Sequence, residues 1–122
     1  MADLILQQKI SRLILKSSAR IANFRKPEKF TLGAAIQETQ LKMLRLAIMA
    51  NKSRTSKRQH FQFELDTELE VHRALIDVAV APETKVISPG LHRDWSAELD
   101  EIGRLLGKWI QSTTAKPPAS PE

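Results

Sequence analysis

Apolar residues recur every three to four positions in four stretches of the chain, at residues 2–23, 31–50, 59–81 and 89–112. This spacing places the apolar side chains on one face of an α-helix. The connecting segments contain proline or a run of polar and basic residues, and no stretch alternates apolar and polar residues as a β-strand would. The pattern therefore predicts four amphipathic helices and no sheet.

Local signals indicate where two of these helices begin. Thr31 is placed to cap the second helix, and Phe30 just before it is expected to pack at the helix entry. Ser88 and Pro89 are placed to begin the fourth helix, because serine is a favoured cap and proline fits the first turn.

Helices of about 20 residues joined by short connections pack antiparallel to their neighbours. The predicted fold class is therefore all-α, an antiparallel up-down four-helix bundle over residues 1–112. Residues 113–122 lack the apolar pattern and are rich in proline and small polar residues, so they are predicted to form a disordered tail.

The fourth helix contains two glycines, Gly103 and Gly107, in its interior. Each costs about 1 kcal/mol relative to alanine at such a position. Residues four apart share a helix face, so the pair makes room for a close backbone or for a large side chain. The partner helix belongs either to the same chain or to a neighbouring subunit. Arg104 and Trp109 are further packing or interface candidates, with Arg104 expected to pair with a carboxylate of the third helix.

The charge of the chain is unevenly distributed. The 122 residues carry a net charge of +5. Residues 1–61 contain 13 Lys or Arg and 3 Asp or Glu, whereas residues 62–122 contain 6 and 11. This asymmetry indicates either an electrostatic partner for the first half or two halves that dock onto each other.

The basic residues of the first half form a helical stripe and two loop groups. The stripe recurs at spacings of three and four residues, which line its members on one helix face. A basic stripe with basic loops suits contacts to nucleic-acid phosphates, although a solvated helix face would look the same. The predicted nucleic-acid-binding residues are Lys9, Arg12, Lys16 and Arg20 in the stripe, and Arg25, Lys26, Lys29, Lys52, Arg54, Lys57 and Arg58 in the loops.

No arrangement of residues indicates catalysis, a metal or a cofactor. The chain has no cysteine, no Glu-x-x-His pair for a di-metal bundle, and no glycine-rich phosphate loop. His72 lies on the apolar stripe of the third helix and is expected to be a hydrogen-bonded core residue. The sequence therefore predicts a protein that is not an enzyme. With no apolar run of about 20 residues and no signal peptide, it is expected to be cytoplasmic.

Three segments resemble one known family. They are NFRKPEKFTLGAAIQETQLKMLRLAIMAN, KRQHFQFELDTELEVHRALIDVAV and LDEIGRLLGKWI. The last is the most specific, through the Gly-Arg-x-x-Gly-x-Trp-Ile pattern that begins at Gly103. Over residues 5–112 the chain resembles the four-helix-bundle family of the accessory protein of diversity-generating retroelements, called accessory variability determinant. That family is related to proteins encoded in ribosomal-RNA intervening sequences.

The resemblance implies a non-enzymatic bundle that assembles as a barrel-like homopentamer. It would bind the reverse transcriptase and template RNA or cDNA of the retroelement and support mutagenic reverse transcription. The alternative is a scaffold or interaction protein of the intervening-sequence type without a nucleic-acid role. Because the third helix carries an acidic patch, the basic first half is expected to make any nucleic-acid contact. The patch comprises Glu64, Asp66, Glu68 and Glu70.

Overall fold

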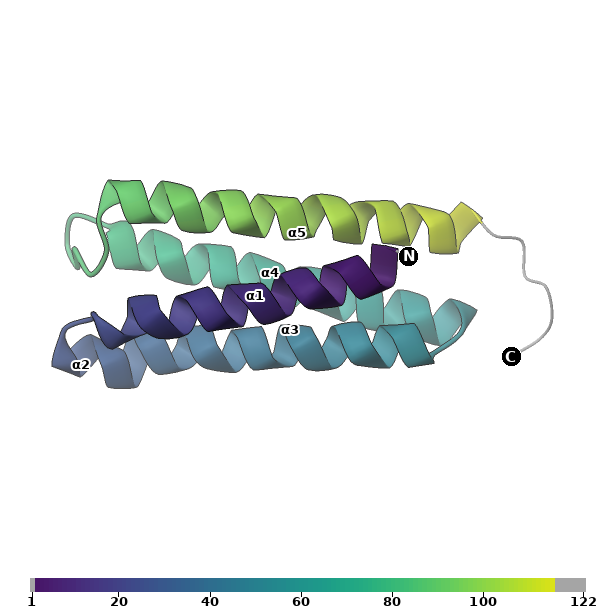
Figure 1. Ribbon diagram of the computed structural model, residues 1–122, viewed down its shortest axis with the longest axis horizontal. Helices are drawn as coiled ribbons and strands as arrows, with labels where there is room; N and C mark the ends of the chain where they lie inside the picture. Colours follow the sequence, from purple (N-terminus) through teal and green to yellow (C-terminus); the bar gives the residue numbers. More distant parts are fainter. Residues whose placement is uncertain (1, 116–122) are drawn as a thin grey trace.

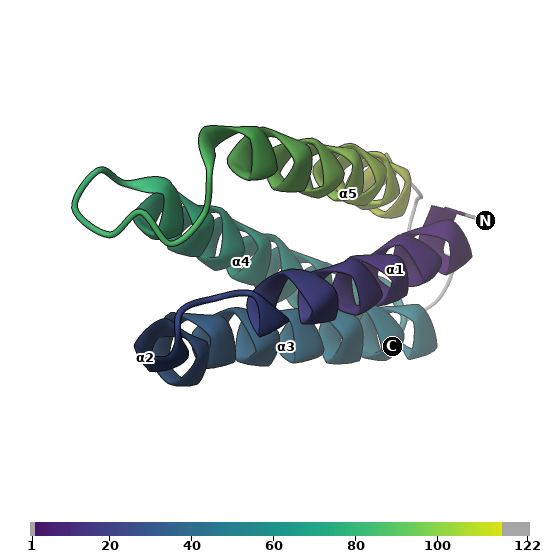
Figure 2. The same ribbon diagram turned by 60° about the vertical axis from the view of Figure 1, so that its left-hand side comes forward.

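Four long helices pack as an antiparallel bundle in the computed structural model, which describes residues 2–115 (Figure 1). The long helices are α1 (Ala2–Ala22), α3 (Ala34–Lys52), α4 (Thr55–Val80) and α5 (Pro89–Ala115), and a short α2 (Lys26–Glu28) and a π-helical turn (Lys29–Gly33) lead into α3. Each long helix packs against two others in the cyclic order α1, α3, α4, α5, so α1 and α4 are diagonal (Figure 2). The predicted all-α bundle is confirmed. None of the helices in the described residues is long and apolar enough to cross a membrane.

The last helix continues beyond its predicted end. It reaches Ala115, three residues into the segment expected to be a tail, and residues 116–122 lie outside the described part of the chain. The cause is Thr113, which is buried. Its hydroxyl donates to the Trp109 carbonyl at 3.0 Å and accepts a hydrogen bond from Gln62 Nε2 at 3.0 Å. This contact fixes the end of α5 against the beginning of α4.

The entry into α3 differs from the sequence prediction. Helical structure begins at Lys26, because Pro27 fits the first turn of a helix. Thr31 therefore lies inside the helical segment, where its hydroxyl donates to the Pro27 carbonyl at 3.1 Å and caps nothing. Phe30 is 73% exposed, so its predicted packing role is wrong. Phe24 is buried instead, with its ring edge-on to Trp95 at a centroid distance of 6.4 Å.

Gly33 allows the π-helical turn to approach α1 closely. A Cβ at this position would lie 2.7 Å from Cγ2 of the buried Ile21 and 3.4 Å from the Glu28 carbonyl oxygen. Any side chain would therefore push α1 and the start of α3 apart.

The start of α5 follows the sequence prediction. Ser88 Oγ accepts a hydrogen bond from the Leu91 backbone N–H at 3.1 Å, and Pro89 is the first helical residue. The predicted apolar stripes likewise form the core. Its fully buried large side chains include Leu6, Ile10, Ile36, Met43, Leu65, Leu69, Trp95, Leu99 and Leu106.

A polar cluster from all four long helices lies inside this core, and we call it the buried polar junction. It consists of Ser17 of α1, Gln40 of α3, His72 of α4 and Trp95 of α5, none more than 1% exposed. Gln40 Nε2 donates to Ser17 Oγ at 2.7 Å and lies 2.8 Å from His72 Nε2. Trp95 Nε1 donates to Ser17 Oγ at 3.1 Å. The expectation that His72 is a hydrogen-bonded core residue is confirmed.

The junction requires a neutral His72. An amide N–H₂ can only donate, so His72 Nε2 must accept the Gln40 hydrogen bond and cannot carry a proton. Burial away from water lowers the pKa of His72 from 6.5 to about 4. Protonation of His72 would place a positive charge in a buried site and would remove the acceptor of the Gln40 hydrogen bond.

This pKa shift predicts a stability that falls with acidity. Between pH 6.5 and 4 the unfolded chain binds a proton at His72 that the native protein does not, so the free energy of unfolding rises with pH in this window. The loss from pH 7 to pH 4 should be about 3 kcal/mol. Urea denaturation across this range measures it, with His72→Gln as the non-titrating control. Equal pH dependence of the two proteins would contradict the assignment.

Candidate nucleic-acid interface

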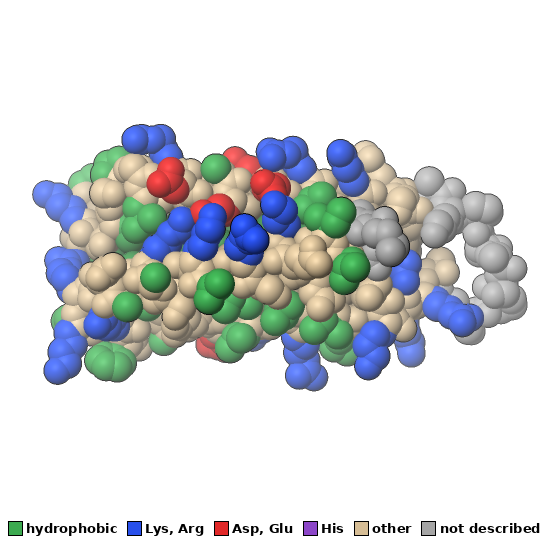
Figure 3. Space-filling model, viewed as in Figure 1, with side chains coloured by type: hydrophobic (Ala, Val, Ile, Leu, Met, Phe, Trp, Pro, Cys, Tyr) green, Lys and Arg blue, Asp and Glu red, His purple; other side chains and the backbone are tan. Residues whose placement is uncertain are grey.

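The predicted basic stripe lies along α1 where that helix meets α5. In this seam a row of Lys and Arg side chains lies beside Asp and Glu side chains (Figure 3). Lys9 Nζ lies 2.5 Å from a carboxylate oxygen of Glu101, and Lys16 Nζ lies 3.6 Å from Glu98. Both lysines are about half exposed, at 43% and 50%. The two halves of the chain therefore do dock onto each other here, as one of the two interpretations of the charge asymmetry expected.

Arg20 is committed to holding α1 against α5. Its two terminal nitrogens donate to the two carboxylate oxygens of Glu98 at 2.7 and 2.8 Å. The guanidinium carbon lies 5.3 Å from the ring centroid of Trp95, and the Arg20 side chain is only 17% exposed. Bidentate pairing and a cation–π contact give Arg20 a structural role in the protomer.

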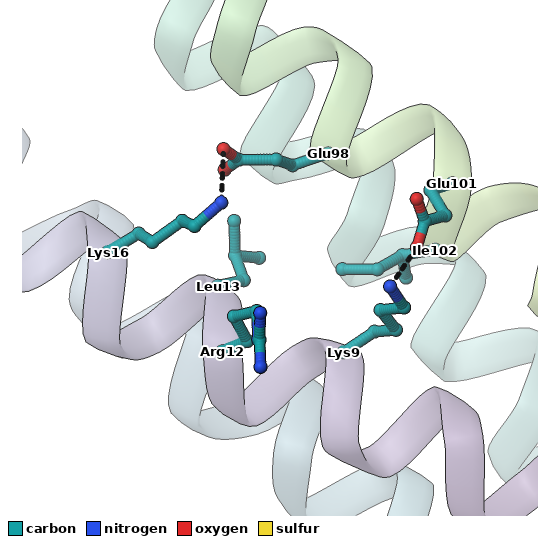
Figure 4. A pocket seen from close by; sticks show the side chains of 7 residues that line it. All are labelled: Lys9, Arg12, Leu13, Lys16, Glu98, Glu101 and Ile102. Atoms are coloured by element: carbon teal, nitrogen blue, oxygen red, sulfur yellow. Dashed lines mark ion pairs between the residues drawn. The ribbon is translucent and has the colours of Figure 1, made fainter.

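Arg12 differs from its neighbours in the stripe. It is exposed and has no ion-pair partner among residues 2–115. Figure 4 shows it between Lys9 and Lys16, each of which reaches across to α5. The hydrogen bond and the charge of Lys9 lower the pKa of Glu101 below its usual value. The Lys9–Glu101 pair therefore remains charged at neutral pH.

The two basic loops lie at opposite ends of the bundle (Figure 1). One end contains α2 and the α4–α5 connection, which Arg25 links by donating to the Thr84 carbonyl at 2.5 Å. Arg25 Nε also lies 3.0 Å from Glu28. We call this the α2 end, defined as residues 24–30 and 81–94. It contains five Lys or Arg and three Asp or Glu, so its charge is mixed.

The other end is rich in positive charge, although Asp3 in the first turn of α1 also lies at this end. We call it the basic end, defined as residues 42–63 and 102–115. These ranges contain eight Lys or Arg and no Asp or Glu. Lys52, Arg54 and Lys57 are exposed, and no carboxylate in the described residues pairs with them. Lys42 pairs with Glu38 at 3.5 Å, and the other seven lysines and arginines of this end form no ion pair among the described residues.

Arg58 stabilises the basic end from within. Its Nε donates to the Ala50 carbonyl at 3.0 Å and its Nη2 to the Asn51 carbonyl at 3.3 Å. Both carbonyls lie in the last turn of α3, and the Ala50 carbonyl also accepts the Ser53 backbone N–H at 3.2 Å. The guanidinium also lies 5.8 Å from the ring centroid of the buried Trp109, which attaches the α3–α4 connection to α5.

Some basic residues at these ends were not among the nucleic-acid-binding residues predicted from the sequence. Lys108 joins the basic end through α5, next to the Trp109 that Arg58 contacts. Lys85 joins the α2 end through the α4–α5 connection, and Arg93 joins it through the beginning of α5. Each is isolated in the sequence among acidic or apolar neighbours, so only the packing of α5 groups them with the loops.

The acidic patch lies on α4, diagonal to α1, so it does not face the basic stripe. Within the protomer Arg104 is exposed and forms no ion pair among the described residues. The ion pair between α4 and α5 has its cation on α4 and its carboxylate on α5, the reverse of the predicted arrangement. Arg73 of α4 lies 2.5 Å from Asp100 of α5.

The two glycines of α5 have different surroundings. A Cβ on Gly103 would lie 2.9 Å from Arg73 Nη2 and 3.5 Å from Leu69 Cδ2. Gly103 therefore leaves a slot for the Arg73 side chain as it reaches Asp100. A Cβ on Gly107 would have nothing within 4 Å, and Gly107 is exposed. Within the described part of the protomer, no contact offsets the lower helix propensity of Gly107 relative to alanine.

Residues 2–115 contain no group of three or more His, Asp or Glu side chains placed to hold a metal ion. His60 and His92 each lie beside one carboxylate, Glu64 at 3.3 Å and Asp77 at 2.8 Å. These pairs lie on the surface and lack a nucleophile or a third polar partner. The arrangement is that of a charged binding surface on a rigid helical scaffold.

Fold and charge thus define a helical bundle protein with one strongly basic end. The chain belongs to the bAvd-like family, whose model matches residues 4–113. The resemblance to accessory variability determinant is thereby confirmed, and family membership indicates an accessory role in a diversity-generating retroelement. No curated protein and no solved structure matches the chain.

The open space at Gly107 and the close contact at Gly33 predict opposite effects of substitution by alanine on stability. Gly107→Ala should raise the free energy of unfolding of the protomer by up to about 1 kcal/mol, because alanine is the better helix former and no atom obstructs it. Gly33→Ala should lower it by about 1–2 kcal/mol through overpacking against Ile21. Urea denaturation at low protein concentration compares the two. A destabilising Gly107→Ala would show that this position is not open in the protomer.

Proposed function

We propose that the protein is the non-catalytic accessory subunit of a diversity-generating retroelement. In this role it binds the reverse transcriptase and the template RNA or its cDNA, and supports mutagenic copying. Family membership supports the association with the reverse-transcription machinery. The observation that carries the nucleic-acid part of the proposal is the basic end, where seven of the eight Lys or Arg have no carboxylate partner among the described residues.

The basic end suits contact with phosphates in a sequence-independent way. Lys52, Arg54 and Lys57 are exposed and have no carboxylate partner in the described chain, so binding a phosphate there breaks no existing ion pair. Of the remaining predicted binding residues, Arg12 is also exposed and has no ion-pair partner in the described chain, whereas Arg20 and Arg58 serve mainly to position the surface. Such contacts give an affinity that falls as salt rises.

We further propose that the protomers assemble as a homopentamer. Gly107 supports an intermolecular contact at α5, because its missing side chain has no use within the protomer. Helix-interior glycines allow another backbone to approach closely. In a ring with parallel bundle axes the basic ends would all lie on one rim, and this multiplies the weak contacts of each protomer.

Charge reversal at the two ends tests where nucleic acid binds. The triple variant Lys52→Glu/Arg54→Glu/Lys57→Glu should weaken binding of a mixed-sequence RNA oligonucleotide at least tenfold at 100 mM KCl. The matched control is Lys26→Glu/Lys85→Glu/Arg93→Glu, which changes the net charge equally at the α2 end. Fluorescence anisotropy measures both affinities. Equal losses would indicate a net-charge effect only, and no binding by the unaltered protein would favour the scaffold alternative.

Sedimentation velocity tests the assembly. The unaltered protein should sediment as a pentamer at micromolar concentration. Gly107→Ala should shift the distribution towards protomers although it stabilises each one, because the added methyl group obstructs a neighbouring helix. A monomeric protein, or a variant whose assembly is unchanged, would contradict the role given to Gly107.

A further inference from the structure

A small cavity opens in the seam between α1 and α5. Its volume is about 140 Å³, enough for a few water molecules or one phosphate group. Figure 4 shows Lys9, Arg12 and Lys16 along one wall and Glu98 and Glu101 along the other. The apolar side chains of Leu13 and Ile102 complete the lining.

The charges around this cavity are not balanced. Three cations line it, Lys9, Arg12 and Lys16, against two carboxylates, Glu98 and Glu101. Arg20 occupies both oxygens of Glu98, so Lys16 reaches that carboxylate only at 3.6 Å. Arg12 has no ion-pair partner among the described residues. The cavity therefore has a surplus of positive charge that no side chain of the described chain satisfies.

We propose that this cavity is a subsite for one backbone phosphate of a bound nucleic acid. In this subsite the phosphate contacts Arg12, which has no carboxylate partner in the described chain. It also contacts Lys9 and Lys16, replacing Glu101 and Glu98 as their ion-pair partners. The subsite rests on the proposed nucleic-acid-binding function and adds a second contact region to the basic end. It also assigns a role to Glu101, which competes with the phosphate for Lys9.

The exchange of partners is physically reasonable for Lys9 and unfavourable for Arg20. The Lys9–Glu101 pair is 43% and 42% exposed, so water can solvate the released carboxylate, and exposed pairs contribute little to stability. The Arg20–Glu98 pair is bidentate and mostly buried, so it stays intact and keeps α1 attached to α5. The phosphate therefore enters without opening the bundle.

Continuity with the basic end identifies the phosphate as that of a polynucleotide. The first turns of α1 lie at the same end of the bundle as the α3–α4 connection (Figure 1). The cavity begins at Lys9, in the third turn of α1. Because the α1–α5 seam lies on the side of the bundle opposite the α3–α4 pair, a strand whose phosphates contact Lys52 and Arg54 crosses the basic end to enter the seam at Lys9.

Removing the competing carboxylate should strengthen binding. Glu101→Gln should raise the affinity for a 20-nucleotide mixed-sequence single-stranded RNA about threefold. The matched control is Glu70→Gln, which removes one exposed negative charge on α4, diagonal to α1. Glu70→Gln should change the affinity less than 1.5-fold. Fluorescence anisotropy at 50–300 mM KCl, with circular dichroism to verify folding, measures both variants.

Removing the central cation should weaken binding and reduce its salt dependence. Arg12→Ala should lower the affinity three- to tenfold and reduce the slope of log affinity against log salt by about 0.7, the value for one lost phosphate contact on a single strand. Arg93→Ala, which removes an exposed arginine at the α2 end, is the control and should leave the slope unchanged.

Two outcomes would overturn the subsite. Equal effects of Glu101→Gln and Glu70→Gln would show that only net charge matters, and equal slopes for Arg12→Ala and Arg93→Ala would show that no phosphate enters the cavity. If the basic-end triple variant still loses affinity in either case, the proposed function stands and only the subsite is wrong. If the unaltered protein does not bind RNA, both proposals are wrong.

Discussion

The arrangement of this bundle depends on one buried amide. Gln40 bonds to Ser17 and His72, and Ser17 in turn accepts from Trp95, so each long helix contributes one polar group to a single connected cluster. Apolar side chains alone would tolerate a helix sliding by one turn, whereas a slide here would leave buried polar groups unpaired. The junction therefore fixes the register of the helices.

That register determines the surface chemistry of the α1–α5 seam. Arg20 lies three residues beyond Ser17 on α1, and Glu98 lies three residues beyond Trp95 on α5. Because α1 and α5 run antiparallel, these two steps lead in opposite directions along the bundle, and the long Arg20 side chain reaches Glu98 by passing over the Trp95 ring. Lys16 and Lys9 then reach the same line of carboxylates. The distribution of free and paired cations is a consequence of how the core is assembled.

Much of the fold could be predicted from the sequence, because it depends on local periodicity. The four helices, the apolar core, the Ser88 cap and the buried His72 follow from spacing within single segments. The entry to α3 could not be predicted in this way. A π-helical turn after Pro27 places Thr31 inside the helix and Phe30 outside the core, and no composition rule identifies such a turn.

Only part of the candidate site could be predicted from the sequence. Arg20 and Glu98 are 78 residues apart, so their pairing depends on which helices are neighbours and in which register. The positions of the two basic loops at opposite ends could have been predicted, because successive connections of an up-down bundle lie at opposite ends. Grouping all basic residues of the first half into one surface overlooked that constraint.

Chemical-shift mapping of the backbone amides during titration with a single-stranded RNA tests the central claim most directly. If the basic end is the nucleic-acid surface, shifts should concentrate at residues 52–58 and 104–110 and along the α1–α5 seam. The α2 end and the outer face of α4 should be unaffected. Shifts centred on residues 24–30 and 81–94, or no shifts at all, would contradict it.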